Sequence, residues 1–91
     1  MNLESIVKQK AAVVDVRSAG EFASGHVAGS VNIPLQEITL HLDELRTMKQ
    51  PIVLCCASGN RSGQATMLLK SHGIDCMNGG PWFEVDELKA A

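Results

Sequence analysis

The sequence predicts an α/β fold in which a small parallel β-sheet is covered by helices on both faces. Two short apolar runs rich in β-branched residues, AAVVDV at 11–16 and IVLCC at 52–56, are each followed at once by polar, glycine-containing sequence. Runs of this kind are typical of strands that are buried on both faces. Strand-like and helix-like segments alternate along the chain, which is the order expected for a parallel sheet with crossover helices.

The segment between these two strands predicts three further elements. A short helical piece is expected around 19–24, inside the turn-rich sequence SAGEFASGHVAGS. VNI at 31–33 is expected to form a brief strand that stops at Pro34, because the residue before a proline favours extended backbone. One helix should follow, because four apolar residues fall on one face at helical spacing: Leu35, Ile38, Leu42 and Leu45.

The last third of the chain predicts a second crossover helix, a strand and a final helix. The second helix is expected to start near Ser62 and to end at Gly73, since glycine suits the position after a helix. IDCMN at 74–78 predicts another short strand, and the glycines that follow it predict a turn. Pro81 is expected near the first position of the final helix.

Length, composition and charge point to one ordinary globular domain spanning residues 1–91. The chain is 45% apolar and 20% charged, and its net charge of −2 comes with no basic run, so no nucleic-acid partner is expected. No apolar stretch approaches the roughly 18 residues of a membrane-spanning helix, and the first residues do not resemble a signal peptide. We therefore expect no membrane partner and a cytoplasmic location.

The cysteines and histidines predict neither a disulfide scaffold nor a metal centre. Three cysteines is an odd count, and two of them are adjacent, a geometry that a disulfide does not easily accept. No CxxC spacing is present, and His26, His41 and His72 lie far apart in the sequence. No metal and no cofactor are expected.

The segment CASGNRS at 56–62 is the candidate functional site. It runs from the end of a predicted strand into a helix, the place where ligands bind in open parallel sheets. Small and turn-forming residues allow the backbone N–H groups to curl inward, the helix adds its positive end, and Arg61 adds a cation. The candidate binding residues are Ala57, Ser58, Gly59, Asn60, Arg61 and Ser62.

Cys56 is the predicted nucleophile of this loop. Side chains alternate along a strand, so Cys55 and Cys56 point to opposite sides and at most one of them faces the loop. Cys55 continues the apolar run IVL, whereas Cys56 begins the turn. A helix amino end and a nearby arginine lower the pKa of a cysteine, which favours the reactive thiolate.

Two motifs resemble those of the rhodanese, or sulfurtransferase, family. DVRSAGEFASGHVAGSVNIP at 15–34 resembles the family's amino-terminal signature, and CASGNRS at 56–62 resembles its active-site loop. LLKSHGI and NGG also fit. The resemblance implies a rhodanese-like fold that lacks the family's usual strand before residue 11, with Cys56 as catalytic cysteine and the amides of 57–62 around it.

The resemblance also implies a reaction and its partners. Cys56 would take a sulfane sulfur from a small anionic donor such as thiosulfate and pass it, as a persulfide, to cyanide or a thiol. Arg61 would help to seat the donor, and a protein sulfur carrier is a further partner of this chemistry. Asp15 and Arg17 are expected to form a salt bridge that anchors loops, with Glu21 in the same cluster, and His26 is expected to be structural.

Two other functions remain open at this point. Five residues separate Cys55 from Arg61, as in the loop of cell-cycle dual-specificity phosphatases, which resemble rhodaneses in fold, whereas four separate Cys56 from Arg61. A cysteine-dependent phosphatase using Cys55 and Arg61 is therefore one alternative. A non-catalytic rhodanese-like binding module is the other.

Overall fold

The structure is a computed structural model that describes residues 2–91. Along the chain its elements are α1 (Leu3–Lys8), β1 (Val13–Asp15), α2 (Ala19–Ala23), β2 (Val31–Asn32), the 3₁₀ helix η1 (Leu35–His41), α3 (Leu42–Thr47), β3 (Ile52–Cys56), α4 (Asn60–Ser71), β4 (Cys76–Pro81) and α5 (Trp82–Ala90). None of the helices within residues 2–91 is long and apolar enough to cross a bilayer.

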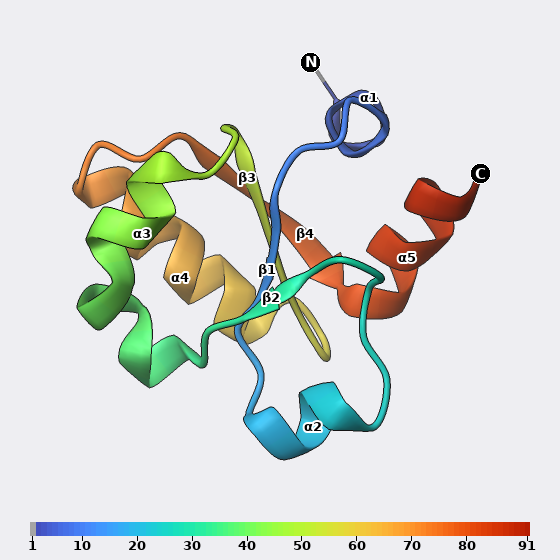
Figure 1. Ribbon diagram of the computed structural model, residues 1–91, viewed down its shortest axis with the longest axis horizontal. Coiled ribbons are helices and arrows are strands. Elements are labelled where there is room, and N and C mark those ends of the chain that lie inside the picture. Colours follow the sequence, from blue (N-terminus) through green and yellow to red (C-terminus); the bar gives the residue numbers. More distant parts are fainter. Residues whose placement is uncertain (1) are drawn as a thin grey trace.

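The four strands form one parallel sheet in the order β2-β1-β3-β4. Figure 1 shows η1, α3 and α4 on one side of this sheet and α1 and α5 on the other, while α2 lies below the carboxyl ends of the strands. This arrangement confirms the predicted fold class, a small parallel sheet with helices on both faces.

Side chains of β3 alternate between two hydrophobic cores, one on each face of the sheet. Ile52, Leu54 and Cys56 belong to the core beneath α3 and α4. Val53 and Cys55 belong to the core beneath α1 and α5. All five residues are fully buried, which is why this strand reads as a continuous apolar run. The two adjacent cysteines therefore occupy different environments.

A buried ion pair at the end of β1 holds the loops below the sheet. Arg17 donates from Nη2 to Asp15 Oδ2 at 2.7 Å and to the carbonyl oxygen of Gly25 at 2.6 Å. The guanidinium also lies 5.0 Å from the ring centre of Trp82, within cation–π range. The expected anchoring role of Asp15 and Arg17 is confirmed by these contacts, since they join β1, the turn after α2 and α5.

The first ten residues contain a helix that the sequence analysis did not predict. Asn2 caps α1, because its Oδ1 accepts a hydrogen bond from the amide of Ser5 at 2.8 Å. Ile6 and Val7 pack into the core on the α5 side. A helix therefore occupies the place before residue 11 where the family usually has a strand, and it covers the same face of the sheet as α5.

Residues 35–47 form two helices in place of the single predicted one. The amide of Leu35 donates to the carbonyl of Val16, and the amide of Glu37 donates to Pro34 three residues back, which starts a 3₁₀ turn. A 3₁₀ helix has three residues per turn, so Leu35 and Ile38 still share a face. The predicted apolar face is thus correct, although the helix type of its first half is not.

The glycines after residue 78 do not form the predicted turn, because β4 continues through them to Pro81. A Cβ atom on Gly79 would lie 2.7 Å from Val53 Cγ1 and 2.8 Å from Val85 Cγ2. The absence of a side chain here lets β4 pass between β3 and α5. Glycine is needed at this position for close packing inside the sheet.

We expect Gly79→Ala to lower the free energy of unfolding by about 1–3 kcal/mol, the usual cost of overpacking a well-filled core. Gly20→Ala is the matched control, since nothing lies within 4 Å of a Cβ at this helical position. That change should be neutral or slightly stabilising. Urea unfolding of both variants tests this, and equal stabilities would contradict the packing explanation.

Candidate active site

The candidate site lies where β3 ends and α4 begins, at the carboxyl edge of the sheet (Figure 1). Cys56 is the last residue of β3, and α4 starts at Asn60, two residues before the predicted start. Gly59 caps the helix with a φ of 100°, a left-handed conformation that favours glycine. A connection of three residues therefore brings the first turn of α4 back over Cys56.

Three donors of this turn surround the sulfur of Cys56. The amide of Gly59 lies 3.0 Å from Sγ, the amide of Ser62 lies 3.4 Å away, and the hydroxyl of Ser62 lies 3.3 Å away. The first amides of a helix have no acceptor within the helix, so they are free to bind an anion. The loop thus supplies to the sulfur the donors that an ionised thiol requires.

These contacts determine the pKa of Cys56. Burial raises the pKa, but the hydrogen bonds from the Ser62 hydroxyl and from the amides of Ser62, Gly59 and Ser58 outweigh it and hold the pKa below that of a free cysteine. Amides from three of the six predicted loop residues therefore act on the sulfur. The amide of Asn60 differs, since it donates to Ser58 Oγ at 3.4 Å.

The sulfur is enclosed as well as hydrogen-bonded. Cys56 is 0% exposed, whereas Ala57 and Ser58, which follow it, are exposed. A small molecule therefore reaches Sγ only when the surrounding residues move. Ala57 and Ser58 are exposed, so they can move without opening the hydrophobic core.

Cys55 lies in a different environment and does not fit the role of nucleophile. It is fully buried in the core beneath α1 and α5, and burial together with the nearby charge of Asp15 raises its pKa to about 12. A thiol with this pKa stays protonated at neutral pH. The structure therefore does not support the alternative of a phosphatase that uses Cys55 with Arg61, because Cys55 lies in the core on the other face of the sheet from Cys56.

Asn78 supports the loop from the neighbouring strand β4, and the sequence analysis assigned it no role. Its Nδ2 donates to the carbonyl of Gly59 at 3.0 Å, and its Oδ1 accepts from the amide of Gly80 at 2.9 Å. These two backbone partners fix the orientation of the amide group. The motif NGG was visible in the sequence, but only the fold brings Asn78 against the loop.

Asn78 also competes with Cys56 for the proton of Ser62. The Ser62 hydroxyl lies 2.6 Å from Asn78 Oδ1, which is an acceptor only, and 3.3 Å from the sulfur of Cys56. A hydroxyl has one proton, so it donates to one of the two at a time. Donation to Asn78 leaves the sulfur with its amide donors alone, and donation to the sulfur adds the hydroxyl as a further donor.

Arg61, the predicted cation of the loop, directs its guanidinium hydrogen bonds to Glu21, a partner that the sequence analysis did not predict. Its Nη1 and Nη2 donate to Glu21 Oε1 and Oε2 at 2.7 and 2.9 Å. The pKa of Arg61 is raised, first by its hydrogen bonds to Glu21 and, to a smaller extent, by the negative charge of Cys56. Arg61 thus acts on the thiolate through its charge, while its hydrogen bonds join α4 to Glu21 of α2.

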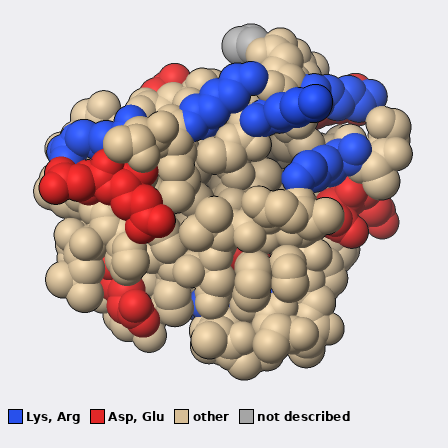
Figure 2. All heavy atoms as spheres, in the orientation of Figure 1, with Lys and Arg blue, Asp and Glu red and all other residues tan. Residues whose placement is uncertain are grey.

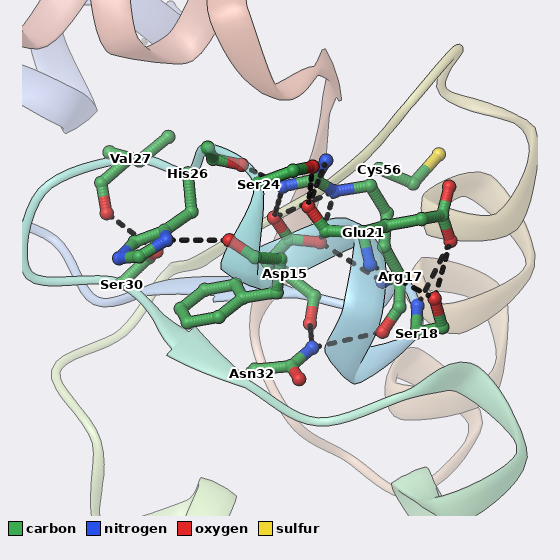
Figure 3. Close-up of polar contacts among 12 residues, drawn as sticks. Asp15, Arg17, Ser18, Glu21, Ser24, His26, Val27, Ser30, Asn32 and Cys56 are labelled. Carbon is green, nitrogen blue, oxygen red and sulfur yellow. Dashed lines mark hydrogen bonds and ion pairs between the residues drawn. The ribbon is translucent and has the colours of Figure 1, made fainter.

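Glu21 joins the site through its side chain and the Arg17 cluster through its backbone. Its carbonyl oxygen accepts from Arg17 Nη1 at 3.3 Å, while its carboxylate accepts from Arg61 and from Ser18. Figure 3 shows the Glu21 carboxylate and the Cys56 sulfur at the same end of this group of side chains. The hydrogen bonds from Arg61, followed by those from Ser18, lower the pKa of Glu21 to about 2.

His26 is structural in this arrangement, as expected. Its Nδ1 lies 2.7 Å from the carbonyl oxygen of Phe22, and its ring stacks on that of Phe22 with 3.7 Å between the ring centres. Figure 3 shows His26 in the turn after α2, away from the Cys56 sulfur. Across residues 2–91 no group of three histidine, cysteine or acidic side chains is placed to hold a metal ion.

The comparisons with known proteins point to one family. The family model described as Rhodanese-like domain matches residues 2–80. An uncharacterised Bacillus subtilis protein, YqhL, is 42% identical over 65 residues, which cover 71% of this chain and 51% of that protein. A thiosulfate:glutathione sulfurtransferase of Saccharomyces cerevisiae is 33% identical over 73 residues, covering 67% of this chain and 52% of the yeast protein.

A solved structure agrees with these matches. The human single-domain sulfurtransferase TSTD1 is 32% identical and superposes with a TM-score of 0.74, covering 93% of this chain and 89% of the human chain. Other matches include thiosulfate sulfurtransferases and a putative sulfur carrier protein. The chain spans about half the length of the first two curated relatives described above.

We expect one thiol of this protein to ionise below the range of free cysteine, and we expect it to be Cys56. The ultraviolet absorbance of the thiolate, followed as pH rises, should show this early transition in the native protein and in Cys55→Ala. Cys56→Ala should lack it, because the pKa values of Cys55 and Cys76 are both raised by burial. An early transition that survives Cys56→Ala would contradict the assignment.

The shared proton of Ser62 makes a second prediction. Ser62→Ala should raise the pKa of Cys56, because a donor to the thiolate is lost. Asn78→Ala should lower it, because the hydroxyl of Ser62 is then free to donate to the sulfur. The same titration of Ser62→Ala/Asn78→Ala is the control: removing Asn78 should have no effect once the hydroxyl is gone, and an undiminished shift would show that Asn78 acts by another route.

Proposed function

The chain belongs to the rhodanese-like domain family, and from this premise we propose that it is a sulfurtransferase that carries sulfur as a persulfide on Cys56. The donor provides a sulfane sulfur, as thiosulfate does, and the acceptor is thiophilic, such as cyanide or a thiol. The observation that carries the proposal is the set of donors around Cys56 Sγ: the amides of Gly59 and Ser62 and the hydroxyl of Ser62.

The reaction consists of two displacements at sulfur. The Cys56 thiolate attacks the outer sulfur of thiosulfate, the sulfur–sulfur bond of the donor breaks, and sulfite leaves with the electron pair. Cyanide or a thiolate then attacks the outer sulfur of the cysteine persulfide, and the Cys56 thiolate leaves. Neither step needs a metal, a redox cofactor or a base that removes a proton from the nucleophile.

The loop stabilises both anionic states of the site. Helix-terminal amides hold the negative charge of the thiolate before the first displacement and after the second. We assign donor and persulfide binding to the backbone of Ala57, Ser58, Gly59, Asn60, Arg61 and Ser62. The outer sulfur of the persulfide needs space that the enclosed Cys56 lacks, so loading requires the connection between β3 and α4 to move outward.

The proposal extends to organisation, location and partners. We infer one rhodanese domain across residues 1–91. The free thiols Cys55, Cys56 and Cys76 suit a reducing compartment, which supports the cytoplasm as the place of action. We assign a small anionic donor and a thiol or cyanide acceptor as its partners, and a protein sulfur carrier as a further partner that suits this chemistry.

A non-catalytic binding module is the second candidate, and one observation favours it. Cys56 is 0% exposed, so a chain whose loop never opens would keep the fold without the reaction. The two candidates differ in whether sulfur can be loaded onto Cys56.

We expect incubation with thiosulfate, followed by mass spectrometry of the intact protein without reductant, to add the mass of one sulfur atom. Cys56→Ala should add none, and Cys55→Ala, the matched control, should load as the native protein does. The loaded protein should release thiocyanate when cyanide is added. Loading by neither thiosulfate nor an organic persulfide would favour the binding module, and loss of loading only in Cys55→Ala would move the nucleophile to Cys55.

A further inference from the structure

The one cation of the loop is already neutralised in the folded protein. Arg61 and Glu21 form a two-bond ion pair that joins the first turn of α4 to α2, 40 residues earlier in the chain. Both side chains remain more than a third exposed, at 36% and 38%, so the pair lies at the surface end of the site. An approaching donor therefore meets a carboxylate beside the guanidinium.

Glu21 is held in place independently of Arg61. Ser18 and Glu21 form a capping box at the start of α2: the amide of Ser18 donates to Glu21 Oε1 at 3.0 Å, and the amide of Glu21 donates to Ser18 Oγ at 3.3 Å. With a pKa of about 2, the side chain carries its negative charge throughout the physiological range. The carboxylate is a fixed part of the site.

The other charged groups beside the loop do not restore a positive field. Asp15 and Arg17 neutralise each other in their buried pair. A carboxylate oxygen of Glu84 would lie 3.7 Å from a Cβ on Gly80, whose backbone lies against Gly59. Lys89, the basic residue of α5, keeps its charge, but its hydrogen bond to the carbonyl of Ala28 places it beside the turn between α2 and β2.

The charge balance of these side chains is negative. Arg17, Arg61 and Lys89 balance the carboxylates of Asp15, Glu21 and Glu84, so the Cys56 thiolate leaves one net negative charge. On the face shown in Figure 2, the Lys and Arg atoms gather at the upper edge, around α1, and few lie at the lower end, where Figure 1 places α2. Repulsion grows in proportion to the charge of the incoming donor.

We propose that Glu21 selects the sulfur donor: paired with Arg61, its carboxylate disfavours dianionic donors such as thiosulfate relative to organic persulfides, which present sulfane sulfur with at most one negative charge at the reacting end. This inference rests on the sulfurtransferase activity proposed above and specifies its donor class. With a persulfide R–S–SH, the Cys56 thiolate attacks the outer sulfur, the donor's sulfur–sulfur bond breaks, and R–S⁻ leaves with the electron pair.

Glu21→Gln is the variant that isolates the charge. Glutamine also serves at the third position of a capping box, so the start of α2 keeps its hydrogen bonds with Ser18. Glu4→Gln is the matched control, because it removes a carboxylate from an exposed ion pair, with Lys8 at 3.8 Å, on α1 at the opposite end of β1. Thermal unfolding of both variants checks that the fold is retained.

The experiment compares kcat/KM for thiosulfate with kcat/KM for the persulfide of 2-mercaptoethanol. We expect Glu21→Gln to raise the thiosulfate-to-persulfide ratio by about tenfold, equivalent to about 1.4 kcal/mol, and Glu4→Gln to leave the ratio unchanged. In the native protein, kcat/KM for thiosulfate should rise with ionic strength, because salt screens repulsion. This rise should be smaller in Glu21→Gln.

Three outcomes would overturn the inference. An unchanged or lower ratio in Glu21→Gln would show that its carboxylate does not act on the donor. A native thiosulfate rate that falls with salt would show a net attractive site, whatever the stability of the variant. Absence of transfer from both donors in the native protein would overturn the proposed function as well, whereas transfer from both with an unchanged ratio would overturn only the role of Glu21.

Discussion

The position of one sulfur atom at the end of a strand determines the rest of this site. β3 is buried on both faces, so its alternation sends Cys55 into one core and Cys56 toward α4. The strand ends at Cys56, and the next helix begins at Asn60, with its first amides left without acceptors inside the helix. The same geometry that completes the sheet therefore gives the sulfur its hydrogen-bond donors, and no extra element is needed to build an anion site.

The neighbouring strand β4 keeps these donors in place. Gly79 lets the strand pass close to Val53 and Val85, and this close passage brings Asn78 within reach of Gly59 and Ser62. Asn78 thus fixes the turn through Gly59 and also accepts a hydrogen bond from the hydroxyl of Ser62, which has a single proton to donate. Support of the loop and ionisation of the thiol are opposed at this residue, since a stronger bond from Ser62 to Asn78 leaves one donor fewer for the sulfur.

Much of the fold and part of the site follow from sequence patterns that are local. Buried parallel strands, an apolar helix face and a glycine at a helix end are each encoded within a few residues, so the fold class and the β3–loop–α4 unit could be predicted. The choice of Cys56 over Cys55 is of the same kind, because alternation along a strand needs no knowledge of the partner strands. The N-cap of α1 was an equally local signal, carried by Asn2, and was missed because the segment has only one helical turn of apolar residues.

Tertiary structure alone decided what the polar side chains of the loop bind. Arg61 is a free cation in the sequence, but packing of α2 below the sheet supplies Glu21 from 40 residues away. Ser62 meets Asn78 only because β4 pairs with β3, and β4 continues through its glycines because Val53 of β3 and Val85 of α5 leave no space for a side chain at Gly79. Sequence determines the elements and their buried faces, since these depend on near neighbours; packing determines charge pairing and proton sharing, since these depend on which distant residues are brought together.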